Sequence, residues 1–125
     1  NSFKNYFLDT KRIIKMDREL IEMDKLEGRM LKSGTVIYSS LLRLRVLYML
    51  KSILNKKSYM NKDFEKWLIG EIGINKEYYE KLYEVYRSIL NNKKTKEIIS
   101  ISTAERLINL LEKEVKDYGK KKKET

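Results

Sequence analysis

The segment from residue 35 to residue 55 constrains the fold most, because apolar side chains occupy nearly its whole circumference when it is drawn as a helix. A helix that is apolar on every side has to be surrounded by other parts of the protein. The chain contains no proline and only five glycines, and no segment sustains the two-residue alternation of a surface strand. These features predict an all-α protein, a bundle of about five helices in which residues 35–55 form the central, nearly all-apolar second helix.

A long N-terminal helix is predicted over residues 2–32, where apolar residues recur at the spacing of one helical face. Gly34 would end this helix, and Gly28 is the place where it would break. Unbroken, about 30 residues would span about 45 Å, whereas a domain of this size is only about 36 Å across. A protruding helix would expose its apolar stripe, and the simplest cover is a second copy of the chain. We therefore expect a homodimer whose contact residues are Phe3, Phe7, Met16, Met23 and Met30.

End signals divide the rest of the chain into three further helices. Asn61 is a predicted N-cap, and Gly73 would end the helix that begins there. Asn75 would cap the next helix. The sequence STAE at residues 102–105 has the pattern of a capping box, so we expect the last helix to begin there and to run to about Tyr118.

The formal charge of +10 is unevenly distributed along the chain. Residues 1–60 contain 13 basic and 6 acidic side chains, and residues 119–125 contain 4 and 1. This last stretch, GKKKKET, has nothing to bury and is predicted to be a disordered basic tail, which leaves residues 1–118 as a single helical domain. A folded basic surface can bind an acidic partner or nucleic acid. The candidate contacts to such a partner or to phosphate are Arg43, Arg45, Lys51, Lys56 and Lys57.

The two arginines of the central helix need different explanations, because Arg43 and Arg45 point about 200° apart. Arg43 shares its side with Ser39, Ser40 and Lys51, which is the only polar strip of this helix and therefore its predicted solvent side. Arg45 lies on a side suited to burial, and an unpaired buried guanidinium is costly. It should either bind phosphate or an acidic peptide in a groove, or form an internal ion pair with an acid such as Asp17, Asp24 or Glu84.

Four tyrosines at residues 78, 79, 83 and 86 allow two interpretations. They could stack on the bases of a single-stranded nucleic acid. All but Tyr78 share an apolar helical face with neighbouring leucines, however, and tyrosines so placed pack into a bundle with their hydroxyl groups at its rim. Packing is the favoured interpretation.

Several chemistries are excluded by the residues that the chain lacks. There is no histidine and no cysteine, so a Ser-His-Asp triad, a typical zinc site and a cysteine nucleophile cannot be built. Phosphate-binding glycine loops are absent, and the acidic residues are scattered. We therefore assign no catalytic, cofactor-binding or metal-binding residues, and a carboxylate-only metal-dependent enzyme is the remaining exception. The apolar runs are shorter than the roughly 20 residues of a membrane span, so we expect a cytoplasmic protein without a membrane partner.

Three strings of the sequence carry a family resemblance. LLRLRVLYMLKSILNKKSYMNKDFEKWL, YEKLYEVYRSILNNKK and ISISTAERLINLLEKEV together resemble the helical domain that follows the catalytic domain in some archaeal nucleotidyltransferases, which is similar to the HEPN class of helical bundles. Nuclease members of that class carry an arginine followed, after four to six residues, by a histidine. Here the corresponding positions hold residues 48–50 after Arg43 and residues 50–52 after Arg45, and none is histidine. RNase activity is therefore not expected.

These observations together favour a noncatalytic helical interaction module. The resemblance implies a homodimeric accessory subunit that serves a separate nucleotidyltransferase or an RNA. The alternative is a nucleic-acid-binding protein that uses the basic surface of the N-terminal half.

Overall fold

Five helices form the protein, as the computed structural model shows for the backbone of residues 2–124 and the side chains of residues 4–120. The only strand-like pairing in this part of the chain is an isolated bridge between Met30 and Ser100. The prediction of an all-α bundle is thereby confirmed. The helices are α1 (Ser2–Lys25), α2 (Thr35–Leu54), α3 (Asn61–Ile72), α4 (Lys76–Leu90) and α5 (Ile101–Glu124).

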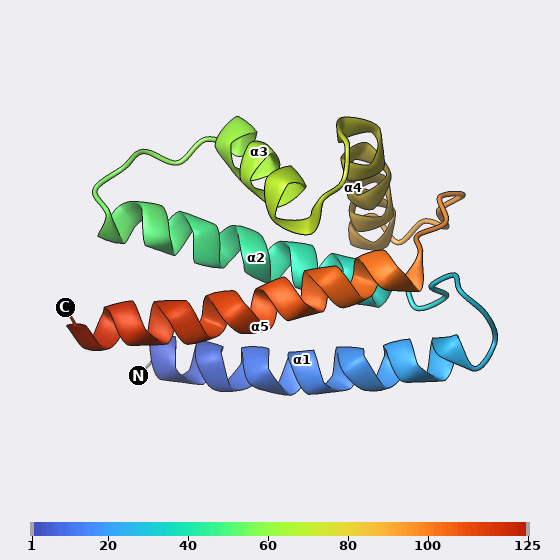
Figure 1. Ribbon diagram of the computed structural model, residues 1–125, viewed down its shortest axis with the longest axis horizontal. Helices are drawn as coiled ribbons and strands as arrows, with labels where there is room; N and C mark the ends of the chain where they lie inside the picture. Colours follow the sequence, from blue (N-terminus) through green and yellow to red (C-terminus); the bar gives the residue numbers. More distant parts are fainter. Residues whose placement is uncertain (1, 125) are drawn as a thin grey trace.

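The three long helices run alongside one another, and each packs against the other two (Figure 1). The shorter helices α3 and α4 lie on the far side of α2 from α1, and α1 begins at the same end of the bundle at which α5 ends. The core between these helices consists of buried aliphatic and aromatic side chains. Among the largest of them are Leu41, Leu44, Leu47, Phe64, Leu68, Leu82, Leu107, Ile108, Leu111 and Tyr118.

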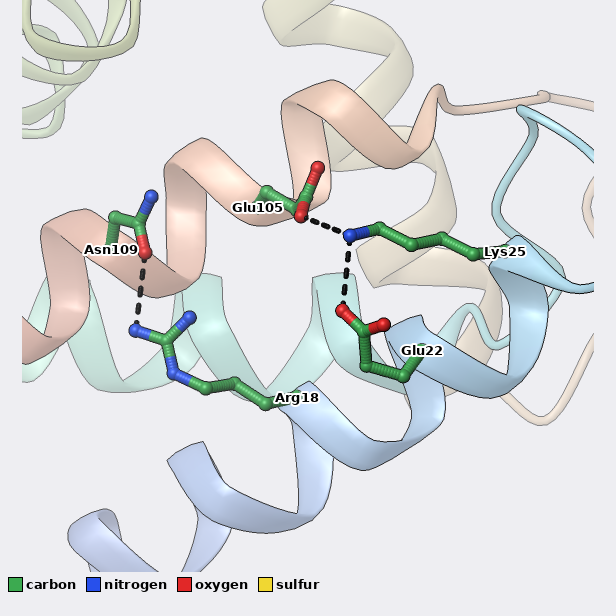
Figure 2. A network of polar contacts seen from close by, with 5 residues as sticks. All are labelled: Arg18, Glu22, Lys25, Glu105 and Asn109. Carbon is green, nitrogen blue, oxygen red and sulfur yellow. Dashed lines mark hydrogen bonds and ion pairs between the residues drawn. The ribbon is translucent and has the colours of Figure 1, made fainter.

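Polar contacts fix the register of α1 against α5 (Figure 2). The guanidinium of Arg18 donates to the side-chain oxygen of Asn109 at 3.1 Å, and the ammonium group of Lys25 lies 2.7 Å from a carboxylate oxygen of Glu105 and 3.0 Å from one of Glu22. These side chains are partly exposed, and solvent screening makes such pairs weak. They specify which residues face each other rather than hold the helices together.

The first helix ends at Lys25, seven residues before the predicted end. Asp24 is the reason: its side chain accepts hydrogen bonds from the backbone N–H groups of Lys32 and Ser33, at 2.9 and 2.8 Å, and so turns the chain back. Gly28, with φ of 147°, adopts a conformation in this turn that other residues rarely reach. The helix of 24 residues is about 36 Å long and does not outgrow the domain. Of the two predicted possibilities, the break is correct and the protrusion is wrong.

Two of the predicted helix ends are confirmed. The side-chain oxygen of Asn75 accepts a hydrogen bond from the backbone N–H of Tyr78 at 2.8 Å, as expected of an N-cap. Gly73 follows α3 in the left-handed conformation, with φ of 65°.

Two other end signals are displaced. Asn61 is the first residue of α3 rather than its cap, and its side chain binds Arg45 and Tyr59 instead. The last helix begins at Ile101, before the predicted capping box, because the hydroxyl of Ser100 accepts the backbone N–H of Thr103 at 3.2 Å. The earlier serine thus takes the capping role.

The basic end of the chain also differs from its prediction, since the backbone of residues 119–124 continues α5. Extending an existing helix adds one hydrogen bond for each residue that is ordered, and lysine is a good helix former. Lysines at a helix C-terminus also interact favourably with the helix dipole. Low apolar content therefore did not prevent helix formation here.

Candidate interaction surface

Arg43 faces the interior of the bundle, not solvent as predicted. Its guanidinium donates to the hydroxyl of the fully buried Thr10 at 2.8 Å and lies 5.3 Å from the centre of the Tyr6 ring, both on α1. The polar strip of α2 is therefore the side that packs on α1. A guanidinium tolerates this position because a hydroxyl acceptor and a ring face replace part of its hydration.

Asp17 of α1 lies in the same interior polar layer. Its carboxylate accepts a hydrogen bond from the hydroxyl of Ser39 on α2 at 2.6 Å, and only 5% of the residue is exposed. Burial raises the pKa of Asp17 to about 6, although the Ser39 hydrogen bond and the charge of Arg43 act in the opposite direction. Ser39 and Arg43 of the strip thus find their polar partners across the α1–α2 contact.

Lys51 is also engaged inside the bundle. Its ammonium group pairs with the carboxylate of Glu114 on α5, and the two side chains are only 17% and 9% exposed. Of the predicted phosphate contacts, Arg43 and Lys51 are therefore committed to internal partners. Neither belongs to the protein surface that a ligand would meet.

Arg45 has no carboxylate partner among the residues that the structure describes, so the predicted internal ion pair is wrong. Its guanidinium donates to the side-chain oxygen of Asn61 at 3.1 Å and lies 5.8 Å from the centre of the Tyr83 ring. It opens onto a shallow groove between α2, α3 and α4, as the second interpretation required. The other residues lining this groove are Asn61, Lys62, Glu65, Tyr79, Glu80, Tyr83 and Arg87.

The three acids considered as partners for Arg45 are used elsewhere. Asp17 binds Ser39, Asp24 holds the turn after α1, and Glu84 pairs with Arg87 at 3.2 Å on α4. Burial on its own would raise the pKa of Asp24, but the hydrogen bonds from the backbone N–H groups of Ser33 and Lys32 lower it below its usual value.

The tyrosines of α4 pack mainly on one another and on α2. Tyr79 is buried, with its ring centre 4.9 Å from that of Tyr83, and Tyr86 stacks on Tyr38 of α2 at 5.0 Å. Burial raises the pKa of Tyr79, so its hydroxyl stays protonated at neutral pH. The interpretation of this row as packing is confirmed for Tyr79, while Tyr83 is half-buried and lines the groove.

The outward side of α2 is uncovered, which the sequence interpretation missed. Leu42, Val46, Met49 and Ile53 recur at the spacing of one helical face, and we call them the α2 stripe. Leu42 and Met49 are each 37% exposed and Ile53 is 62% exposed. The helices α1, α4 and α5 pack on the other sides of α2, and α3 contacts it through the ring of Tyr48. These neighbours leave part of its apolar surface uncovered.

Basic side chains border the α2 stripe. Arg45 and Tyr59 line a depression together with Leu42, Val46 and Met49 of the stripe. Lys56 and Lys57 lie at the C-terminal end of the stripe, where their backbone N–H groups donate to the carbonyl oxygens of Ile53 and Ser52. Lys62 of α3 lines the groove into which Arg45 opens. We define Arg45, Lys56, Lys57 and Lys62 as the basic rim. None of these four forms an ion pair in the described part of the chain. No Asp or Glu occurs in the sequence from residue 28 to residue 62.

The predicted dimer stripe of α1 is not one continuous surface. Met16 and Met23 are 52% and 64% exposed, but Phe7 turns inward and its ring centre lies 5.1 Å from that of Tyr118. Met30 lies beyond the end of α1, in the turn that pairs with Ser100. The side chain of Phe3 is outside the described residues.

The described residues include no group of three or more acidic side chains close enough to hold a metal ion. Nor does any helix in this part of the chain have the length and hydropathy of a membrane span. Comparison of the chain with protein-family models, with curated proteins and with solved structures gave no match.

Proposed function

We propose that this protein is a noncatalytic helical module that binds another polypeptide chain. The observation that carries the proposal is the α2 stripe, which leaves three large apolar side chains exposed on a helix whose opposite side is buried in the core. Contiguous exposed apolar surface of this kind is typical of protein-binding sites. Burial of each such side chain at an interface would contribute roughly 1 to 3 kcal/mol.

Self-association is the simplest form of this function. A homodimer could use Met16 and Met23 of α1, as the sequence suggested, or the α2 stripe. Sedimentation velocity at tens of micromolar should reveal a dimer, and replacement of Met16 and Met23 by serine should dissociate it. A dimer that survives this change but dissociates when Met49 and Ile53 become serine would place the contact on α2. A monomer at all concentrations would contradict the homodimer.

A nucleotidyltransferase is the partner that the family resemblance suggests. The protein would then be the separate helical subunit of an enzyme whose catalytic chain lacks one. Co-expression with a nucleotidyltransferase encoded by a neighbouring gene, followed by gel filtration, tests this directly. A complex that fails to form with the Met49 and Ile53 variant supports the assignment, and the absence of any complex with the wild-type chain argues against it.

Nucleic-acid binding is the second candidate function, and the basic rim is the observation in its favour. Four cations without ion-pair partners could contact phosphates, together with the other exposed lysines of the chain. Binding to single-stranded RNA or duplex DNA should then weaken steeply between about 50 and 200 mM salt. No binding at the lower concentration would remove this candidate.

A further inference from the structure

We infer that the α2 stripe and the basic rim together form a docking site for an acidic amphipathic helix of a partner protein. This inference rests on the proposed function, since it specifies the chemistry of the chain that the module binds. It assigns a role to the exposed apolar side of α2 and to the cations beside it that form no ion pair. Apolar contacts would supply the affinity, and the charges would select the partner.

The dimensions of the stripe match one face of a helix. Its residues span positions 42 to 53, which is about three turns or about 16 Å along α2. A second helix lying along it would offer apolar residues at the same spacing and could pack ridges into grooves in the usual way. Arg45 and Tyr59, which line the depression beside Leu42, Val46 and Met49, would then meet the side of that helix.

Charge decides which helix fits. All four residues of the basic rim are cations, and none forms an ion pair in the described part of the chain. Glu65 and Glu80 line the groove beside Arg45 and Lys62, so the charge without nearby carboxylates is that of Lys56 and Lys57 at the end of the α2 stripe. Lys25 and Lys51, by contrast, are paired with Glu105 and Glu114 of α5, so their charges are not available to a partner. A partner helix with Glu or Asp flanking its apolar face would supply the missing charges.

A second copy of α2 is a poor occupant for the same reason. In a two-fold symmetric contact the same surface meets itself, so the two basic rims would lie against each other. The helix α2 contains basic residues but no acidic ones with which to compensate. Nucleic acid also fits less well, because phosphates would contact the rim but leave the α2 stripe exposed to water.

The test uses three labelled synthetic peptides of about 16 residues, long enough for four helical turns. The first has leucines at the spacing of the α2 stripe, flanked by glutamates. The second replaces the glutamates with lysines, and the third replaces the leucines with serines. Fluorescence anisotropy with the full chain should show that the first binds at least about tenfold more tightly than either of the others. Its affinity should fall as salt is raised, because the rim charges are exposed.

Two variants of the protein locate the site. Met49→Ser with Ile53→Ser should weaken binding of the acidic peptide by at least about tenfold, which corresponds to about one apolar side chain lost from the contact. Lys57→Glu with Lys62→Glu should reverse the preference, so that the lysine peptide binds more tightly. The matched control is Lys113→Glu with Lys116→Glu on exposed positions of α5, which makes the same change of net charge and should leave the preference unaltered. Circular dichroism establishes that each variant is folded.

Three results would overturn the inference. Equal binding of the acidic and lysine peptides, or no binding of either, would show that the basic rim does not select an acidic helix. Self-association that Met49→Ser with Ile53→Ser abolishes would make a second copy the occupant, and would leave the proposed interaction function intact. RNA that displaces the acidic peptide and is itself lost with Lys57→Glu and Lys62→Glu would favour nucleic acid instead. Failure of all binding and of self-association would contradict the proposed function as well.

Discussion

At the scale of single residues, the two arginines show how strongly tertiary contacts decide a side chain's role. Arg43 donates to Thr10 of α1 within the bundle, while Arg45 opens onto the groove between α2, α3 and α4. Their 200° separation on the helix required different roles, but it did not say which side was the inner one. Polar partners from α1, together with Glu114 of α5, made the polar strip of α2 an internal surface.

The buried carboxyl of Asp17 should make stability depend on pH. Its pKa of about 6 in the folded protein lies above the usual 3.8, so the folded state binds this proton more tightly than the unfolded chain does. The resulting contribution to the free energy of unfolding is fully present below about pH 4 and is lost as the pH rises through 6. Asp17→Asn should therefore match the wild type near pH 4 and be more stable at pH 7, by roughly 1 to 2 kcal/mol. Urea unfolding at both pH values measures this difference. A wild type that is the more stable protein at pH 7 would contradict the expectation.

The internal pair of Lys51 and Glu114 should be sensitive to loss of one partner. Both side chains are nearly buried, so Lys51→Met would leave the Glu114 carboxylate without its counter-charge. We expect a loss of about 3 to 5 kcal/mol in the free energy of unfolding. The double variant Lys51→Met with Glu114→Leu should recover most of that loss, because no charge then remains buried. Chemical denaturation of the wild type, of Lys51→Met, of Glu114→Leu and of the double variant measures the coupling. Additive losses would show that the pair does not interact.

At the scale of secondary-structure elements, α2 has two apolar sides with different roles. The inner side includes Leu41, Leu44 and Leu47, which are fully buried, whereas the α2 stripe faces outward. Residues on the two sides belong to the same residue types, so hydropathy does not separate them. The surrounding helices cover only the first, and the second remains available for binding.

Substitutions on the two sides of α2 should differ in their effect on stability. Leu44→Ala removes a fully buried side chain and should lower the free energy of unfolding by about 2 to 5 kcal/mol. Ile53→Ser changes a residue that is 62% exposed and should alter it by no more than about 0.5 kcal/mol. Thermal and urea unfolding of both variants, at a concentration where the chain is monomeric, compares them. A comparable loss in both would mean that the stripe is covered within the chain.

At the scale of the whole molecule, the net charge of +10 opposes compaction. Like charges repel more strongly in the folded protein than in the expanded chain, and salt screens this repulsion. The exposed ion pairs such as Arg12 with Asp9 are weak and lose little by screening. Folding stability should therefore increase with ionic strength.

Salt should raise the melting temperature for this reason. Between about 20 and 300 mM sodium chloride we expect an increase of a few degrees, which corresponds to about 1 kcal/mol for a domain of this size. Differential scanning calorimetry measures the change, and potassium chloride serves as a control for a specific ion effect. A melting temperature that falls with salt would show that attractive pairs outweigh the general repulsion.

The helices and some of their ends followed from the sequence alone, because they depend on neighbouring residues. Asn75 binds a backbone N–H three residues away, and Gly73 allows the left-handed turn that ends α3. Apolar periodicity likewise reflects contacts one helical turn apart. The early end of α1 also has a local cause, although the Asp24 side chain that turns the chain was not recognised from its position.

Tertiary structure alone decided which surfaces are buried and which are free. Arg43 meets Thr10 across 33 residues, and Lys51 meets Glu114 across 63, so neither partner is encoded by spacing along a helix. The exposure of the α2 stripe depends on where all the other helices pack. The sequence of a helix shows how apolar each of its faces is. Which of these faces are covered depends on how helices from distant parts of the chain pack against it.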